Sequence, residues 1–590
     1  MCAVADQLWE RDTLRRDDIA RNLQRFNAKD ATGRIRTGAA DNLRVNLTKS
    51  VTETLMAKIG KNRPRPTVLT DGADHSLRVR AKKLQKFFDG VYSQAEVYAK
   101  SPPVFRDALL GGTGVFHFFA DFGNRRVAME RVFPDEILVD PLEAINGTPQ
   151  TMFRHKYVSK DVLARMFPKE AKEILALASL GQEKTRELFP SYSPETDALP
   201  RMVCVVEAWQ LAGRTYGGEL VPGKHVIASG ECTLRVEPWE HDFFPFEFFH
   251  WTAPVRGFWG DSAVGEIRGI EKEVNKLLQS TQKAMHLTGN PWILNPNGAK
   301  TPTAKLTNEI GLVVGYEGQV PPTVVTHQAV HPSQLQQCWT LFGKAYELLG
   351  TNEQQASGTK PPGIESGRAL EQLSEEHLVR FATVSLHWED LLGRRFPRQL
   401  LRVAQELDDA IPGGFELRAT RNKTALKIKW ADAKISPDDF FVQCFPTSIL
   451  PHLPSGRTQE VERWQANGWI DQTQAQNLLD FPDLESTASV SRVDQELLDQ
   501  QLDLILDEGE EVLPDPRQDL MKALKWGSLR LEKAMLDGYP EENLQKLRNY
   551  LTAVEESLPP PPPAPAPPMD PMMGDPMAMA GVTGPVPPPI

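Results

Sequence analysis

The sequence lacks a long apolar run. Hydrophobic residues make up 40% of the chain, but none of their stretches approaches the ~20 consecutive residues that a membrane-spanning helix requires. The first residues also lack the basic stretch and the apolar core of a secretory signal. We therefore expect no membrane partner and a protein that is made in the cytoplasm.

Cysteine is scarce and scattered. The five cysteines never form a C-x-x-C pair, which excludes a zinc ribbon and argues against a disulfide framework. His327 and His331 have a metal-like spacing, but prolines on both sides prevent the helix that would align them. The sequence therefore predicts no metal and no cofactor.

Signatures of catalysis are missing as well. Each Gly-Lys pair is followed by a residue other than Ser or Thr, so the chain has no nucleotide-binding P-loop. Asp135, Glu136 and Asp140 flank an extended strand, and we interpret them as turn and edge carboxylates. We expect a protein that is not an enzyme, although residues far apart in the sequence could still assemble a catalytic site.

What the sequence contains is a mixed α+β pattern. Residues 1–260 combine amphipathic helices with short strands, and residues 202–250 are especially rich in strand patterns. A chain of 590 residues is long enough for two to four substructures. We predict the α+β class, with long helices at the periphery of the sheet.

The most informative stretch begins with an amphipathic helix at 261–288, whose opposite face is polar. A second helix is predicted at 333–350, and residues 289–332 between the two carry strand and turn patterns. The sequence thus predicts a helical hairpin with a small β insert at its tip. The apolar residues that we expect to pack along this hairpin are Ile267, Ile270, Val274, Leu277, Leu341 and Phe342.

A polar loop and a long helix follow the hairpin. Residues 351–366 are rich in turn formers. A third helix is predicted from Ser366 to about Leu407, with a kink or a break near Gly393 because Pro397 lies inside it. Strands are expected within 367–445 after this helix. Helices are expected across 446–558, including a short one near 518–526, and the Pro- and Met-rich residues 559–590 are predicted to be disordered.

The order of these parts resembles the portal, or head-to-tail connector, proteins of tailed bacteriophages, in particular those of podophages. The likeness covers roughly residues 1–485. Three short motifs carry it: the strand-turn stretch Val132 to Pro141 (VFPDEILVDP), Gly260-Asp261-Ser262 before the first hairpin helix, and Ser366-Gly367-Arg368-Ala369-Leu370 at the start of the third helix.

The resemblance implies a division of the chain into the parts of a portal subunit. These would be a wing (1–260, completed by the long kinked helix and returning strands of 367–445), a stem (261–288 and 333–350), a clip (289–332), a tunnel loop (351–366), a crown (446–558) and the tail (559–590).

The resemblance also implies a function. Copies of the chain would form a ring, usually dodecameric, at one capsid vertex of the virion, through which DNA enters during packaging and leaves at infection. The other partners would be the packaging ATPase (terminase), tail adaptor proteins, capsid and scaffolding proteins, and double-stranded DNA in transient passage. The tunnel-loop residues expected to line the DNA channel are Asn352, Glu353, Gln354, Gln355 and Lys360.

The charge distribution leaves two alternatives open. Residues 1–100 carry 20 Lys and Arg against 12 Asp and Glu, so one alternative is a metal-dependent enzyme that processes nucleic acid. The other is a different capsid or tail structural protein, which would use the α+β body for interactions. Residues 262–350 carry 7 basic and 6 acidic residues, and this near-neutrality fits the passage of DNA better than tight binding.

Overall fold

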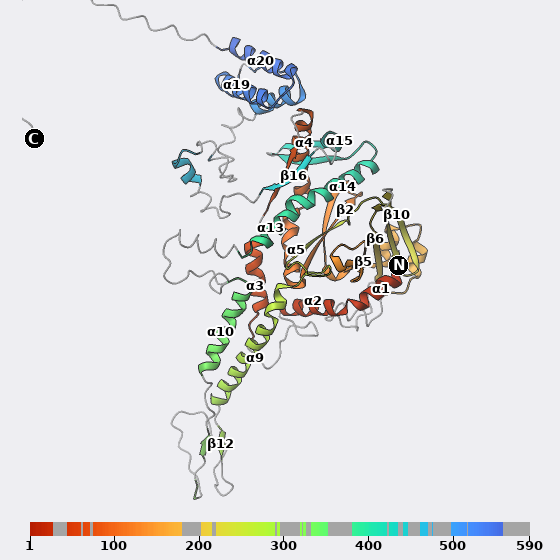
Figure 1. The fold of residues 1–590 in the computed structure, drawn as a ribbon, viewed down its shortest axis with the longest axis vertical. Coiled ribbons are helices and arrows are strands. Elements are labelled where there is room, and N and C mark those ends of the chain that lie inside the picture. Colours follow the sequence, from red (N-terminus) through yellow and green to blue (C-terminus); the bar gives the residue numbers. More distant parts are fainter. Residues whose placement is uncertain are drawn as a thin grey trace, which may run out of the picture. The chain divides into compact units, whose positions relative to one another are not determined.

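The computed structural model divides the chain into two compact units, Met1–Gly72 with Ser76–Pro451 and Ala73–His75 with His452–Ile590. It describes residues 1–27, 44–60, 63–70, 75–179, 202–214, 220–289, 292–294, 319–320, 323–325, 332–351, 380–421, 424–434, 440–445, 461–469, 475, 497–515 and 517–558. Helices and antiparallel sheets are mixed in the first unit (Figure 1). This arrangement confirms the predicted α+β class.

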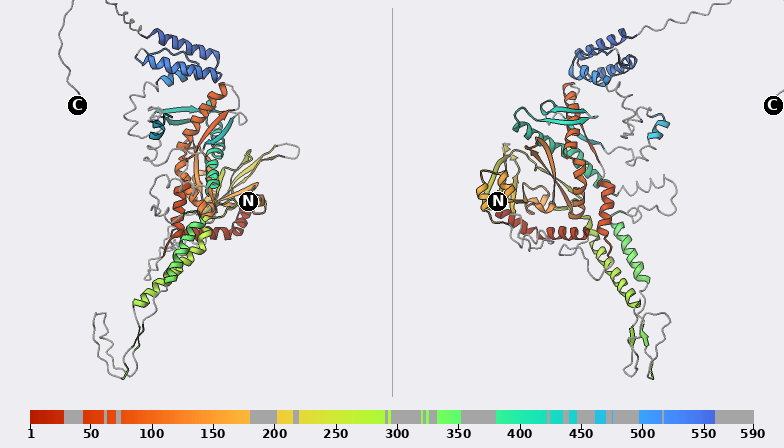
Figure 2. Two further views of the ribbon diagram at one scale, coloured as in Figure 1. Left: turned by 60° about the vertical axis from the view of Figure 1, so that its left-hand side comes forward. Right: turned by 180° about the vertical axis from the view of Figure 1, so that it is seen from behind.

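Two larger antiparallel sheets organise the first unit (Figure 2). One has the strand order β10-β9-β6-β5-β4, and the other has the order β11-β2-β3. Their strands are β2 (Thr113–Asp121), β3 (Arg126–Val132), β4 (Ile137–Leu138), β5 (Thr151–Ser159), β6 (Met202–Gln210), β9 (Gly223–Ser229), β10 (Cys232–Trp239) and β11 (Phe246–His250). Short two-stranded ladders pair β1 (Arg65–Thr70) with β16 (Phe440–Phe445), β7 (Gly213–Arg214) with β8 (Leu220–Val221), and β14 (Glu416–Arg421) with β15 (Thr424–Lys429).

Helices surround these sheets. The N-terminal ones are α1 (Cys2–Arg11), α2 (Thr13–Phe26), α3 (Leu47–Leu55) with a π-helical turn at Met56–Gly60, α4 (His75–Gln94), α5 (Val97–Gly111), α6 (Lys160–Met166) and α7 (Ala171–Ala176). Single 3-10 turns occur at Pro134–Glu136 and Glu143–Asn146. The VFPDEILVDP motif therefore forms the end of β3, a 3-10 turn and β4, a strand-turn-strand unit as its sequence indicates.

The main core of the first unit centres on Trp388, which is fully buried. Its ring lies 5.0 Å from that of Phe105 and 4.8 Å from that of Phe249. Trp388 belongs to α13 (Ala382–Asp390), which is followed by a π-helical turn at Leu391–Arg395, by α14 (Phe396–Ala410) and later by α15 (Trp430–Ala433). A kink or a break was predicted near Gly393; the chain stays helical there, and the α-helical pattern changes to this π-helical turn. The first part of the predicted third helix lies outside the described residues.

The second unit is helical in its described part. A π-helical turn at Leu504–Glu508 precedes α19 (Leu520–Leu536) and α20 (Glu541–Glu556), and Leu502, Ile505 and Leu547 are fully buried in their common core. The predicted short helix near 518–526 is wrong in length, since α19 continues for ten residues beyond it. Gly527 lies inside α19, where Leu551 of α20 packs: a Cβ at Gly527 would come 2.6 Å from Leu551 Cδ2.

Candidate functional site

The helical hairpin predicted from the sequence is present in the first unit. Helix α9 (Ala263–Gly289) is 27 residues long, or roughly 40 Å, and lies beside α10 (Pro332–Leu348). Two short strands lie between α9 and α10 in the sequence, β12 (Trp292–Leu294) and β13 (Thr323–Val325). They pair antiparallel beyond the ends of the two helices (Figure 1). The two helices and the β insert are therefore confirmed, although most of 289–332 lies outside the described residues.

The predicted packing residues divide into two groups. Ile267 and Val274 are completely buried, and Ile270 and Phe342 are partly buried against the main core of the unit. Leu277 and Leu341 are partly exposed. The resemblance to portal proteins implies that neighbouring copies of the chain cover this stripe. Ile267 and Ile270 are covered in another way, because the first turns of α9 pack into the core of their own chain.

A pair of polar residues anchors α9 to the segment that begins α3. Asn275 Oδ1 accepts a hydrogen bond from the Val45 N–H at 2.7 Å, and Asn275 Nδ2 donates to the Val45 carbonyl at 3.0 Å. One turn earlier, Glu271 accepts a hydrogen bond from the Thr48 hydroxyl. Glu271 is 3% exposed and Asn275 is 8% exposed. Both residues belong to the polar face predicted for this helix, and the expectation that this face is open to the solvent is wrong for them, because α3 covers them.

The predicted tunnel-loop residues Asn352, Glu353, Gln354, Gln355 and Lys360 lie outside the described residues. The chain on both sides of them is described, however. The Arg380 guanidinium donates to the carbonyl oxygens of Glu347 at 2.8 Å and Leu348 at 2.6 Å. Gly350 has a φ of +66°, and a Cβ there would come 2.7 Å from Arg380 Cδ. The chain therefore leaves the end of α10 and returns at Arg380 beside the same point.

A second feature is a cleft of about 900 Å³ lined by residues of both larger sheets and of α14. Aromatic rings form part of its wall, including Trp209, which stacks on His225 with ring centroids 4.8 Å apart. The cleft also holds many ionisable groups. Those that line it include His117, Glu130, Arg154, Lys156, Glu207, Arg235, Glu237, Arg402 and Glu406.

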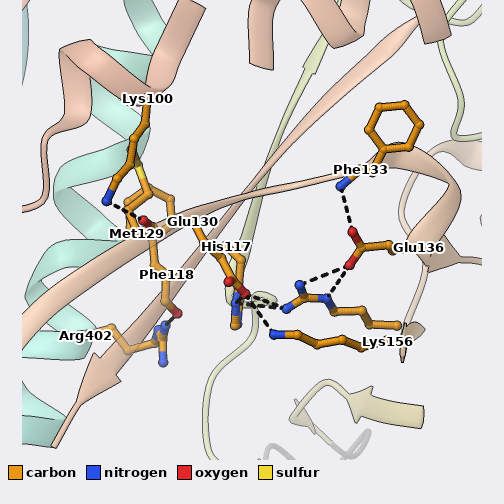
Figure 3. A network of polar contacts seen from close by, with 10 residues as sticks. Lys100, His117, Phe118, Met129, Glu130, Phe133, Glu136, Lys156 and Arg402 are labelled. Atoms are coloured by element: carbon orange, nitrogen blue, oxygen red, sulfur yellow. Dashed lines mark hydrogen bonds and ion pairs between the residues drawn. The ribbon is translucent and has the colours of Figure 1, made fainter. Parts of the chain in front are cut away.

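His117, Glu130, Arg154 and Lys156 belong to one network of ion pairs, together with Glu136 (Figure 3). Arg154 is 2% exposed and donates to Glu130 at 2.8 Å and to Glu136 at 3.1 Å. Glu130 also pairs with His117 Nδ1 at 3.0 Å and with Lys156 at 3.9 Å. No local pattern in the sequence indicates this network, because its members come from β2, β3, β5 and the turn before β4.

The network sets the charge states of its members. Burial lowers the pKa of His117 to about 4, so that its ring is neutral at pH 7. Burial alone would raise the pKa of Glu130, but the hydrogen bond with His117 and the charge of Arg154 outweigh it and lower that pKa. Burial and the neighbouring Glu136 raise the pKa of Asp135 to about 6. The predicted edge carboxylates are thus structural parts of a folded turn.

Searches for other kinds of site and for relatives give little. Among the described residues, no group of three or more His, Cys, Asp or Glu side chains is arranged to hold a metal ion. His327 and His331 lie outside those residues. In the described part of the chain, no helix has the length and apolar character to cross a membrane. No known protein family matches the chain, and no curated protein matches its sequence.

Proposed function

We propose that this chain is a portal subunit, whose copies close into a ring at one vertex of a phage capsid. In this proposal, α9 and α10 form the stem, the β12–β13 ladder belongs to the clip, and DNA passes through the central channel. The observation that carries the proposal is the hairpin itself: two helices bear a small β ladder at one end and are anchored in an α+β body at the other.

The outer part of the hairpin offers apolar surface to a neighbour. Trp339 on α10 is 65% exposed and Met285 on α9 is 57% exposed. Trp339 lies beside Phe342, with ring centroids 6.0 Å apart. Large aromatic side chains are enriched at the centres of protein interfaces. A head-to-tail ring would bury this surface against the next copy, since each subunit in such a ring presents one side to the other side of its neighbour.

The charges of the hairpin suit passage of DNA. Lys276 pairs with Glu273 at 3.6 Å, and Lys344 pairs with Glu347 at 2.6 Å. Among the described side chains of the two helices, the exposed charged residues are four lysines and three glutamates: Glu266, Lys272, Glu273, Lys276, Lys283, Lys344 and Glu347. A wall of Lys and Arg would bind the phosphate backbone tightly through release of counterions. A channel lining with nearly equal numbers of positive and negative charges binds the phosphates weakly, so the duplex can move along it.

The pinned ends of residues 352–379 also support the proposal. Because the chain leaves and returns at the junction of α10 with the body, the segment starts at the inner end of the proposed stem. In this proposal it holds the tunnel loop, with Asn352 to Gln355 and Lys360 facing the channel. The packaging ATPase and the tail adaptors would dock on the clip, and the capsid and scaffolding proteins would hold the body.

Electron microscopy of the purified full-length protein in negative stain tests the proposal. We expect rings with a central channel, and mass photometry should give one assembly of many copies. A single-copy species at high protein concentration would contradict it. An assay on labelled DNA with Mg²⁺ separately tests the alternative of a nucleic-acid-processing enzyme, and degradation of the DNA would favour that alternative.

A substitution on the hairpin sharpens this test. Trp339→Ser should weaken assembly, because truncation of a central interface tryptophan costs about 2 kcal/mol at each contact. Leu142→Ser is a matched control, since Leu142 is 75% exposed but lies in the body, away from the hairpin. Equal assembly of both variants and the unmodified protein would show that α10 does not form the contact.

A further inference from the structure

The cleft between the two larger sheets contains a partly buried carboxylate, Glu207, for which the described residues supply no direct partner. On the cleft side of the five-stranded sheet, Glu207 of β6 lies directly opposite Arg154 of β5 and Ile227 of β9. Arg154 directs its hydrogen bonds to Glu130 and Glu136 instead. No described residue forms a hydrogen bond or an ion pair with Glu207, although its side chain lines the cleft.

The ionised groups around Glu207 do not balance. Three carboxylates, Glu130, Glu136 and Glu207, face only two cations, Arg154 and Lys156. His117 does not supply the missing charge, because it is neutral at pH 7. Burial raises the pKa of Glu207, as expected for a carboxylate that has lost water without gaining a full partner. Glu207 is partly buried, and a carboxylate that has lost part of its water is costly unless a cation joins it.

Three other basic residues of the cleft, Arg235, His225 and Arg402, already have acidic partners. Arg235 and His225 both contact Glu237, and Arg402 contacts Glu406 while its guanidinium donates to the Phe118 carbonyl at 2.8 Å. None of these cations is directed at Glu207. The missing positive charge must therefore come from outside the described part of the cleft.

We propose that the cleft binds an organic cation, an alkylammonium or guanidinium group, through the carboxylate of Glu207. The cleft volume of about 900 Å³ lies within the range of small-molecule sites. The carboxylate supplies an acceptor for charge-assisted hydrogen bonds. Trp209, next on the same face of β6, adds an aromatic wall of the kind that attracts cations. The same chemistry can come from a free amine or from a Lys or Arg side chain of a second copy.

Agmatine, which carries both an amine and a guanidinium, is the probe. Calorimetric titration of the full-length protein at low ionic strength should show saturable binding of one agmatine per chain, and an uncharged diol of similar length should not bind. Glu207→Gln keeps the shape but removes the charge, so binding should become at least about tenfold weaker. Glu231→Gln is the matched control, because Glu231 is exposed at the β9–β10 turn and does not line the cleft.

A second variant supplies the cation internally. Ile227→Lys places an ammonium group on the strand position opposite Glu207, so this variant should keep its circular dichroism spectrum and lose agmatine binding. Absence of saturable binding to the unmodified protein would overturn the proposal. Equal binding by the unmodified protein and folded Glu207→Gln would also overturn it, and so would retained binding by folded Ile227→Lys.

Mass photometry with and without agmatine distinguishes the two sources of the cation. If a side chain of a second copy occupies the cleft, agmatine and Glu207→Gln should both reduce self-association. If the ligand is a free amine, both should leave it unchanged. The site does not depend on ring formation: agmatine binding without rings would contradict only the portal proposal, whereas rings without agmatine binding would contradict only this one.

Discussion

Removal of the Asn275 side chain tests how α9 is anchored. Asn275→Ala deletes both hydrogen bonds to the Val45 backbone, at 2.7 and 3.0 Å. Each such bond contributes about 1 kcal/mol net, so their loss costs about 2 kcal/mol. Alanine stabilises a helix by about 0.6 kcal/mol more than asparagine does, and this gain offsets part of the loss. The net loss is therefore about 1.4 kcal/mol.

Amide hydrogen exchange measures this loss locally. The two hydrogen bonds link α9 to the segment that begins α3, and separation of these two segments exposes their backbone amides to solvent. A loss of about 1.4 kcal/mol corresponds to about tenfold faster exchange in peptides that cover Val45 to Leu55 and the middle of α9. Unfolding of the full chain is a poorer measure, since the two units need not unfold together.

The matched control is Lys276→Ala, at the next position of the same helix. Lys276 is exposed, with 71% of its side-chain surface accessible, and makes only a surface ion pair with Glu273. Such pairs contribute little, so exchange should stay within about twofold of the unmodified protein. If Asn275→Ala exchanges no faster than Lys276→Ala, the assignment of Asn275 as the anchor is refuted.

Three further predictions concern other parts of the structure. The pKa of His117 is lowered from 6.5 to about 4. Between these pH values the unfolded chain binds more protons than the folded one, so the free energy of unfolding should fall by up to about 3 kcal/mol as the pH drops from 6.5 to 4. In melting curves, His117→Gln should reduce this dependence of stability on pH, and an unchanged dependence would contradict the prediction. Gly527→Leu must displace Leu551 and should destabilise the second unit by about 1–3 kcal/mol in thermal unfolding, whereas an unchanged transition would refute the close packing. Arg380→Ala removes two hydrogen bonds to the end of α10 and should speed exchange at residues 345–351 but not at α20.

The sequence predicted the elements whose patterns are local. The hairpin, its β insert and the strand-turn motif all follow from apolar spacing and from Gly and Pro placement, and the structure contains them. Strand β5 was missed for a physical reason. Its centre reads Arg154-His155-Lys156, which looks solvated, yet Arg154 is 2% exposed because acidic partners from β3 and the turn before β4 meet it there.

The candidate sites were harder to predict because they depend on contacts between distant segments. Asn275 looks like any polar residue on an amphipathic helix until Val45, 230 positions earlier, is brought to it. Glu207 stands in an alternating strand whose pattern gives no sign that the neighbouring arginine is already engaged elsewhere. Which polar residues become buried is set by tertiary pairing, and periodicity alone does not contain that information.

Arg380 holds together the two described points that border residues 352–379, the end of α10 and the residue that leads into α13. The separation of these two points is therefore fixed by the folded body and not by the sequence between them. A change in the length of 352–379 does not by itself require the described framework to move.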